Sequence, residues 1–69
     1  MDESIGERLR RYRKGQGLSL DEVAKRANLR LDTLSRMELG QRAIRADEIP
    51  PLAEALGVTV AELYGEAAG

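Results

Sequence analysis

The sequence predicts an all-α protein that folds as one compact five-helix bundle. Apolar residues recur at helical spacing in five separate segments, whereas no segment alternates apolar and polar residues as a half-buried strand does. Residues typical of helix starts and stops stand between these segments, so each segment is expected to be a helix of its own. The length of 69 residues suffices for one small domain.

The first two helices are expected to begin at capping boxes. Ser4 with Glu7 forms one Ser-x-x-Glu pair, and Ser19 with Glu22 forms another. In such a box the serine and glutamate side chains accept hydrogen bonds from backbone amides that the first turn leaves free. The first helix is predicted over residues 5–14, because glycines follow it.

The third helix is predicted over residues 30–39, close behind the second. Asn28 is expected to end the second helix, since asparagine tolerates the left-handed backbone of a tight turn. Leu34 and Met37 form the buried stripe of the third helix, and Gly40 ends it. About three residues therefore join helices 2 and 3, which is the spacing of a helix-turn-helix.

The last two helices are less regular in sequence. Pro50 and Pro51 fit only in the first turn of a helix, because an interior proline removes backbone hydrogen bonds. We therefore expect a fourth helix that begins between residues 47 and 49 and stops at Gly57. Thr59 is placed to cap a fifth helix over residues 60–64.

The composition excludes several classes of function. The chain has no cysteine and no histidine, which removes disulfides, thiolate nucleophiles, the usual transition-metal ligands and the commonest general base. Because the sequence offers no nucleophile with a base and no phosphate-cradling glycine loop, we expect no enzyme, no cofactor, no metal and no small-molecule ligand. No apolar run is long enough for a membrane span, and a cytoplasmic location is expected.

Charge is distributed unevenly along the chain, although the net charge is only −1. All 11 lysines and arginines lie in residues 1–45 beside 7 acids, which gives +4 there, whereas residues 46–69 hold 5 acids and no base. Such an asymmetry can give a nearly neutral protein one basic face that attracts phosphate, since local potential matters more than net charge. Ordinary surface charge is the alternative interpretation.

Three segments together resemble a known family in their order and spacing. IGERLRRYRKGQGLSLDEVA is similar to the first two helices of the phage-repressor and Cro-like helix-turn-helix family, also called the xenobiotic-response-element family. MELG resembles the end of that family's third helix, and LAEALGVTVAEL resembles its closing segment. The match runs from Ile5 to Gly65. It implies a lambda-repressor-like fold, double-stranded DNA as the partner, and a structural ion pair between Arg13 and Glu38.

Helical periodicity predicts that one stripe of the third helix faces away from the core. The resemblance places the family's base contacts on this outward stripe. Arg36 can bind guanine O6 and N7 together, or form an exposed ion pair with Asp32 four residues earlier. Asp32 can accept from cytosine N4, hold Arg36 in place, or merely complement the positive end of the helix. Leu31 can pack on a thymine methyl group or extend the core. The candidate base-reading residues are Leu31, Asp32, Ser35 and Arg36.

Phosphate contacts are expected at both ends of the third helix. Arg30 replaces the usual small N-cap residue, which weakens the cap and brings a charge toward phosphate. Leu20 stands where the family often has a glutamine that clamps a phosphate. Gln41 and its neighbours can offer backbone amides, and Arg42 is the strongest candidate. The candidate phosphate-contacting residues are Arg30, Thr33, Gln41, Arg42 and Arg45.

A single domain of this size would contact only half of a palindromic DNA site, so a homodimer is expected. The last helix is unusually apolar for a chain end, and the resemblance implies a dimer contact there. Tyr64 and Leu63 are the candidate dimer residues, with Tyr64 the better one. Val60 and Leu63 can instead close the core over the first and fourth helices.

The sequence therefore predicts a sequence-specific DNA-binding transcription regulator, a repressor, that places residues 30–39 in the major groove. The alternative is a protein-interaction module or anti-regulator on the same scaffold, which the mixed apolar and acidic character of the outward stripe favours. We expect the domain to span residues 1–65, with residues 66–69 as a flexible tail or the start of a linker.

Overall fold

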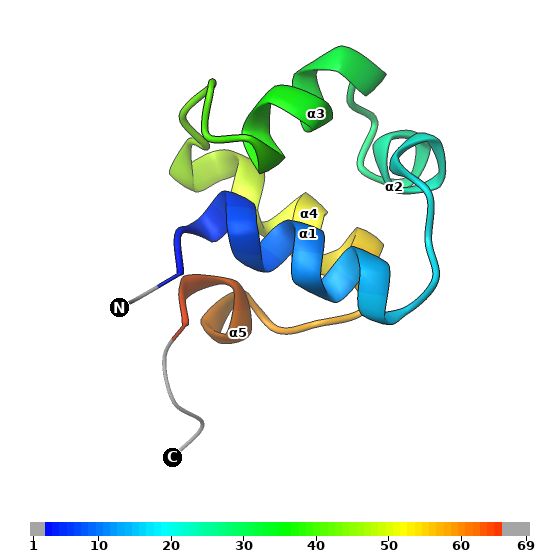
Figure 1. The fold of residues 1–69 in the computed structure, drawn as a ribbon. Coiled ribbons are helices and arrows are strands. Elements are labelled where there is room, and N and C mark those ends of the chain that lie inside the picture. Colours follow the sequence, from blue (N-terminus) through cyan, green and yellow to red (C-terminus); the bar gives the residue numbers. More distant parts are fainter. Residues whose placement is uncertain (1–2, 66–69) are drawn as a thin grey trace.

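The computed structural model describes residues 3–65, which form an all-α bundle of five helices, as predicted (Figure 1). No strand occurs among these residues, and the predicted tail over residues 66–69 lies outside them. None of the helices described is both long and apolar enough to cross a membrane. In chain order the elements are α1 (Ile5–Gly15), α2 (Leu20–Arg26), α3 (Leu31–Glu38), the 3-10 turn η1 (Ala46–Glu48), α4 (Ile49–Leu56) and α5 (Val60–Tyr64).

Helices α1 and α4 occupy the middle of the bundle. α3 and α5 lie on opposite sides of this pair, and α2 stands beside α3 (Figure 1). α1 contacts α3, α4 and α5, while α4 also contacts α2. α2 and α3 thus form one side of the protein and α5 closes the other.

Three helices begin with capping boxes. Ser4 and Ser19 each exchange hydrogen bonds with the glutamate three residues later, which confirms the two boxes predicted for α1 and α2. Thr59 caps α5 as predicted, and Glu62 completes a third box that the sequence analysis did not assign. Each cap satisfies backbone amides that would otherwise lack a partner within the helix.

The start of α4 is split into two kinds of helix. Residues 46–48 form the 3-10 turn, and α4 follows with Pro50 and Pro51 in its first turn, as predicted. Proline is tolerated there because its missing N–H would have no helical carbonyl to bind. Gly57 ends α4 in the left-handed conformation, at φ 68°.

Side chains from the first half of the chain bind the carbonyl ends of the last two helices. Gln16 and Arg26 donate to the last carbonyls of α4, and Arg8 donates to the carbonyl of Leu63 in α5. Donors and cations at this end of a helix satisfy free acceptors and complement the helix dipole. These bonds join residues 29 to 55 positions apart and hold the two halves of the chain together.

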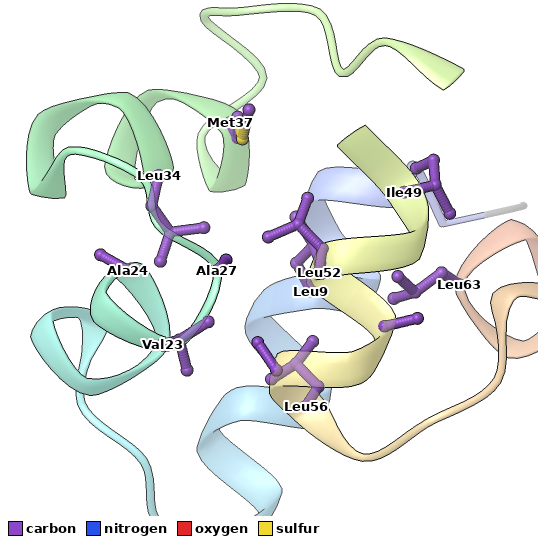
Figure 2. Packing of buried hydrophobic residues seen from close by; sticks show 12 residues of the cluster. Leu9, Val23, Ala24, Ala27, Leu34, Met37, Ile49, Leu52, Leu56 and Leu63 are labelled. Atoms are coloured by element: carbon purple, nitrogen blue, oxygen red, sulfur yellow. The ribbon is translucent and has the colours of Figure 1, made fainter. Parts of the chain in front are cut away.

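The core consists of aliphatic side chains from all five helices (Figure 2). Leu9 of α1 and Leu52 of α4 lie at its centre and are at most 1% exposed. Leu34 and Met37 fill it from α3, as their spacing predicted, and Leu63 fills it from α5. Because these side chains are fully buried, the position of α3 depends on the packing beneath it.

Gly6 allows α1 and α3 to approach closely. A β-carbon at this position would collide with the carbonyl oxygen of Met37 and would lie 3.2 Å from the carbonyl carbon. Both are backbone atoms, so they can move only if α3 moves. The absence of a side chain at Gly6 therefore sets the distance between these two helices, a role that the sequence analysis did not assign.

We expect Gly6→Ala to lower the free energy of unfolding by about 1–3 kcal/mol, because the added methyl group must push α3 away from α1. Gly15→Ala is the matched control, since a β-carbon there meets no described atom within 4 Å and the backbone is ordinary. Urea unfolding followed by circular dichroism measures both. Equal losses in the two variants would contradict the close contact.

Candidate nucleic-acid interface

A turn of four residues, 27–30, joins α2 to α3. Asn28 adopts φ 57°, the left-handed conformation that the sequence predicted for it. The amide of Leu29 donates to the carbonyl of Ala24 at 2.8 Å, which closes the end of α2. Ala24 and Leu34 are both buried in the core, so the two helices are held together by packing as well as by the turn.

An ion pair between Arg13 and Glu38 attaches the end of α3 to α1. Arg13 donates from Nε to Oε2 of Glu38 at 2.8 Å and from Nη2 to Oε1 at 3.0 Å, and its Nη1 donates to the carbonyl of Leu18. The two side chains are only 11% and 5% exposed. Hydrogen bonding to Glu38 raises the pKa of Arg13 above its ordinary value. One guanidinium therefore joins α1, the α1–α2 connection and α3.

The outward stripe of α3 carries the residues that the sequence analysis assigned to base reading. Leu31 is 49% exposed, so it faces outward and does not extend the core. Asp32 and Arg36 are exposed, whereas Ser35 is half-buried. Leu39, which directly follows α3, is 59% exposed and adds a second apolar side chain to this surface.

Asp32 pairs with Arg30 and not with Arg36. Its Oδ1 lies 3.4 Å from Nε of Arg30, and both side chains are largely exposed. Exposed pairs of this kind contribute about 0–1 kcal/mol, so a partner can replace the pair at little cost. Within residues 3–65 no carboxylate pairs with Arg36, which leaves its guanidinium available to a partner.

The N-terminal end of α3 has no side-chain cap. Arg30 occupies the N-cap position, but its side chain makes no hydrogen bond to the helix, because an arginine side chain has no acceptor. Thr33 is half-buried in the first turn. This end of α3 thus combines uncapped backbone amides with an exposed cation, and both favour an anion.

Arg42, the strongest phosphate candidate from the sequence, is held by Glu48. Nη1 and Nη2 of Arg42 donate to Oε1 and Oε2 of Glu48, each at 2.9 Å, and Nη1 also donates to the carbonyl of Ala43. We call this arrangement the Arg42–Glu48 clamp. Hydrogen bonds from Arg42 and from the amide of Arg45 lower the pKa of Glu48 to about 2. In the free protein a carboxylate therefore neutralises this guanidinium, and the contact of Arg42 with a phosphate stays a prediction.

The other two loop candidates differ in what they can offer. The amide of Gln41 donates to the carbonyl of Arg36 at 2.9 Å and closes the end of α3. This amide was expected to be available to a phosphate, but it is already bound within the protein. Only its exposed side chain remains available. Arg45 is 71% exposed and lies 3.5 Å from the equally exposed Asp47, a weak pair that leaves the cation accessible.

A shallow hollow borders the stripe where α1, α2 and α3 meet. Leu20 forms one apolar wall of it, at the position where the resemblance suggested a missing glutamine clamp. In the part of the chain that the structure describes, no group of acidic residues is arranged to hold a metal ion. The residues that line the hollow are Arg10, Arg13, Leu20, Ser35, Glu38 and Leu39.

The structure decides the roles of two residues of α5 that the sequence left open. Leu63 is fully buried in the core, so it cannot contact a second copy without opening the domain, and its assignment as a dimer residue is corrected. Val60, for which closing the core was the alternative expectation, is 39% exposed, and Tyr64 is 42% exposed. The two lie four residues apart and therefore share one face of α5.

A short turn between two helices, with the second helix anchored by its inner face and exposed along its outer face, defines a helix-turn-helix domain. A family model described as a helix-turn-helix domain matches residues 4–64. The chain therefore belongs to the helix-turn-helix domain family.

Several solved structures of regulatory proteins are similar to this chain in fold and in sequence. The restriction-modification controller protein C.AhdI from Aeromonas hydrophila is 36% identical, with a TM-score of 0.82 over 86% of this chain and 89% of that one. The clp gene regulator ClgR from C. glutamicum is 32% identical, with a TM-score of 0.85 over 94% and 84%. SinR, a master regulator for biofilm formation solved in complex with DNA, is 31% identical, with a TM-score of 0.80 over 87% and 97%. No curated protein matches the chain in sequence.

We expect Glu38→Gln to lower the free energy of unfolding by about 3–5 kcal/mol, because Arg13 remains buried without its counter-charge. Asp21→Asn is the control, since it breaks the exposed Asp21–Lys25 pair and should cost at most about 0.5 kcal/mol. Urea unfolding at neutral pH measures both variants. A loss for Glu38→Gln as small as that of the control would show that the pair does not anchor α3.

Proposed function

We propose that this domain is a sequence-specific, double-stranded DNA-binding transcription regulator and acts as a repressor. The observation that carries the proposal is the exposure of the outward stripe of α3. The inner face of the same helix is fixed by buried contacts. A helix presented in this way fits the major groove of B-DNA, where base edges carry a distinct pattern for each base pair. The similarity to SinR, which was solved in complex with DNA, supports the same partner.

The stripe offers three different contacts to base edges. Arg36 has no carboxylate partner among the described residues and can donate two hydrogen bonds to one guanine. Leu31 presents an apolar surface suited to a thymine methyl group, and Asp32 can accept from cytosine N4 once Arg30 turns to a phosphate. An exposed Arg30–Asp32 pair costs little to exchange for these contacts.

Phosphate contacts on both sides of the stripe would orient the helix. Arg30 and Thr33 lie at its N-terminal end beside uncapped amides, and Arg45 is exposed in the segment that follows α3. The side chain of Gln41 is exposed in the same segment. Such contacts fix the register of the protein on the duplex without selecting a sequence.

We expect Arg36→Ala to weaken binding to a selected DNA site by about 1–3 kcal/mol and to relax the preference at one base pair. Arg45→Ala should instead weaken all sequences alike and reduce the salt dependence, since it removes a phosphate contact. Selection from random duplexes followed by salt titrations measures both effects. Failure of the unmodified protein to prefer any sequence at low salt would reject the proposal and favour a protein-interaction module anchored on the exposed Leu39.

The proposal includes a homodimer formed through α5. Val60 and Tyr64 are exposed together on this helix, and α5 lies on the opposite side of the α1–α4 pair from α3 (Figure 1). A second copy bound there would leave the outward stripe of α3 uncovered. A two-fold dimer would then present two stripes to the two halves of a palindromic site.

We expect Tyr64→Asp to convert the dimer into a monomer, because the carboxylate would have to be buried in an apolar contact. Ala46→Asp is the control, since it introduces the same carboxylate at an exposed alanine that lies in η1, outside α5. Sedimentation velocity reports the mass of each variant. A monomeric mass for the unmodified protein, free and bound to DNA, would contradict the dimer.

A further inference from the structure

An acidic residue holds an arginine in the segment that would face the DNA backbone. The Arg42–Glu48 clamp is neutral, and Glu48 itself would repel a phosphate. By charge alone, this acid should weaken the binding of DNA. The geometry of the clamp indicates a different role for it.

The hydrogen bonds of the clamp leave one edge of the guanidinium unused. Nη1 donates its two hydrogens to Glu48 and to the carbonyl of Ala43, and Nη2 donates one of its two hydrogens to Glu48. Nε–H and the second hydrogen of Nη2 make no hydrogen bond within residues 3–65, and the side chain is 35% exposed. These two N–H groups share one edge of the planar guanidinium, which matches two oxygens of a phosphate.

Glu48 is itself restrained. It accepts the amide of Arg45 at 2.8 Å, its side chain is 14% exposed, and it directly precedes the fully buried Ile49 of α4. A restrained carboxylate that binds both terminal nitrogens of Arg42 restrains the guanidinium as well. A long side chain that is already ordered loses less conformational freedom when it binds a ligand.

We propose that Glu48 is a positioning residue for DNA binding: it holds Arg42 so that the Nε–Nη2 edge binds a phosphate of the DNA backbone. This inference deepens the proposed function and rests on it. It predicts an effect opposite in sign to that of net charge, since removal of this acid weakens the binding of a polyanion.

The test compares two variants that remove the same charge. Glu48→Gln keeps one acceptor oxygen for the amide of Arg45 but cannot accept from both terminal nitrogens of Arg42. Glu54→Gln is the control, because Glu54 is exposed on α4 and its side chain makes no hydrogen bond or ion pair with the described residues. Fluorescence anisotropy with a labelled mixed-sequence duplex at low salt measures the Kd of each, at a temperature where circular dichroism shows all variants folded. We expect Glu48→Gln to bind roughly 2- to 10-fold more weakly than Glu54→Gln.

The same substitution in an Arg42→Ala background separates positioning from a general structural effect. If Glu48 acts through Arg42, then Glu48→Gln causes no further loss there. A loss that persists in this background would overturn the inference, because Glu48 would then only stabilise the loop. Tighter binding by Glu48→Gln than by Glu54→Gln would also overturn it, because the acid would then withhold Arg42 from DNA. If the unmodified protein and Glu54→Gln do not bind the duplex at all, the proposed function fails and this inference fails with it.

Discussion

The attachment of α3 to α1 is the constraint on which the rest of the structure depends. The backbones of the two helices are in close contact where Gly6 faces Met37, and a bidentate ion pair joins Arg13 to Glu38. Both contacts reach the last turn of α3, while the turn at Asn28 holds its other end against α2. A distance, an angle and a rotation about the helix axis are fixed together in this way. Side chains on the outward stripe can recognise a partner only because that rotation is fixed.

The basic residues of the segment 1–45 serve two different purposes, which the charge distribution alone does not separate. Some bind carbonyls or carboxylates inside the protein and hold the helices together: Arg8, Arg13, Arg26 and Arg42. Others stand exposed at or beside the ends of α3: Arg30, Arg36 and Arg45. The potential that a polyanion would meet at α3 therefore depends on where the fold places each basic side chain, and not on the excess of +4 as a whole.

Local signals in the sequence predicted what local physics determines. The capping box at Ser4, the left-handed Asn28 and the buried face of Leu34 each depend on residues within one or two helical turns, and the structure confirms them. The role of Gly6 depends on a carbonyl 31 positions away, and the Arg42–Glu48 clamp spans a turn whose shape periodicity does not describe. The resemblance did supply one long-range pair, Arg13 with Glu38, because spacing between motifs carries information that single residues lack.

The missing side-chain cap of α3 has a consequence for the stability of this helix. A serine or aspartate in place of Arg30 would close the helix end and stabilise it by roughly 0.5–2 kcal/mol. Arg30 does not provide this stabilisation, because its side chain offers no acceptor to the first backbone amides of α3. A phosphate oxygen at this end would act as the absent cap, so the duplex would complete the secondary structure of the helix that reads it. Binding of DNA would then also stabilise the first turn of α3.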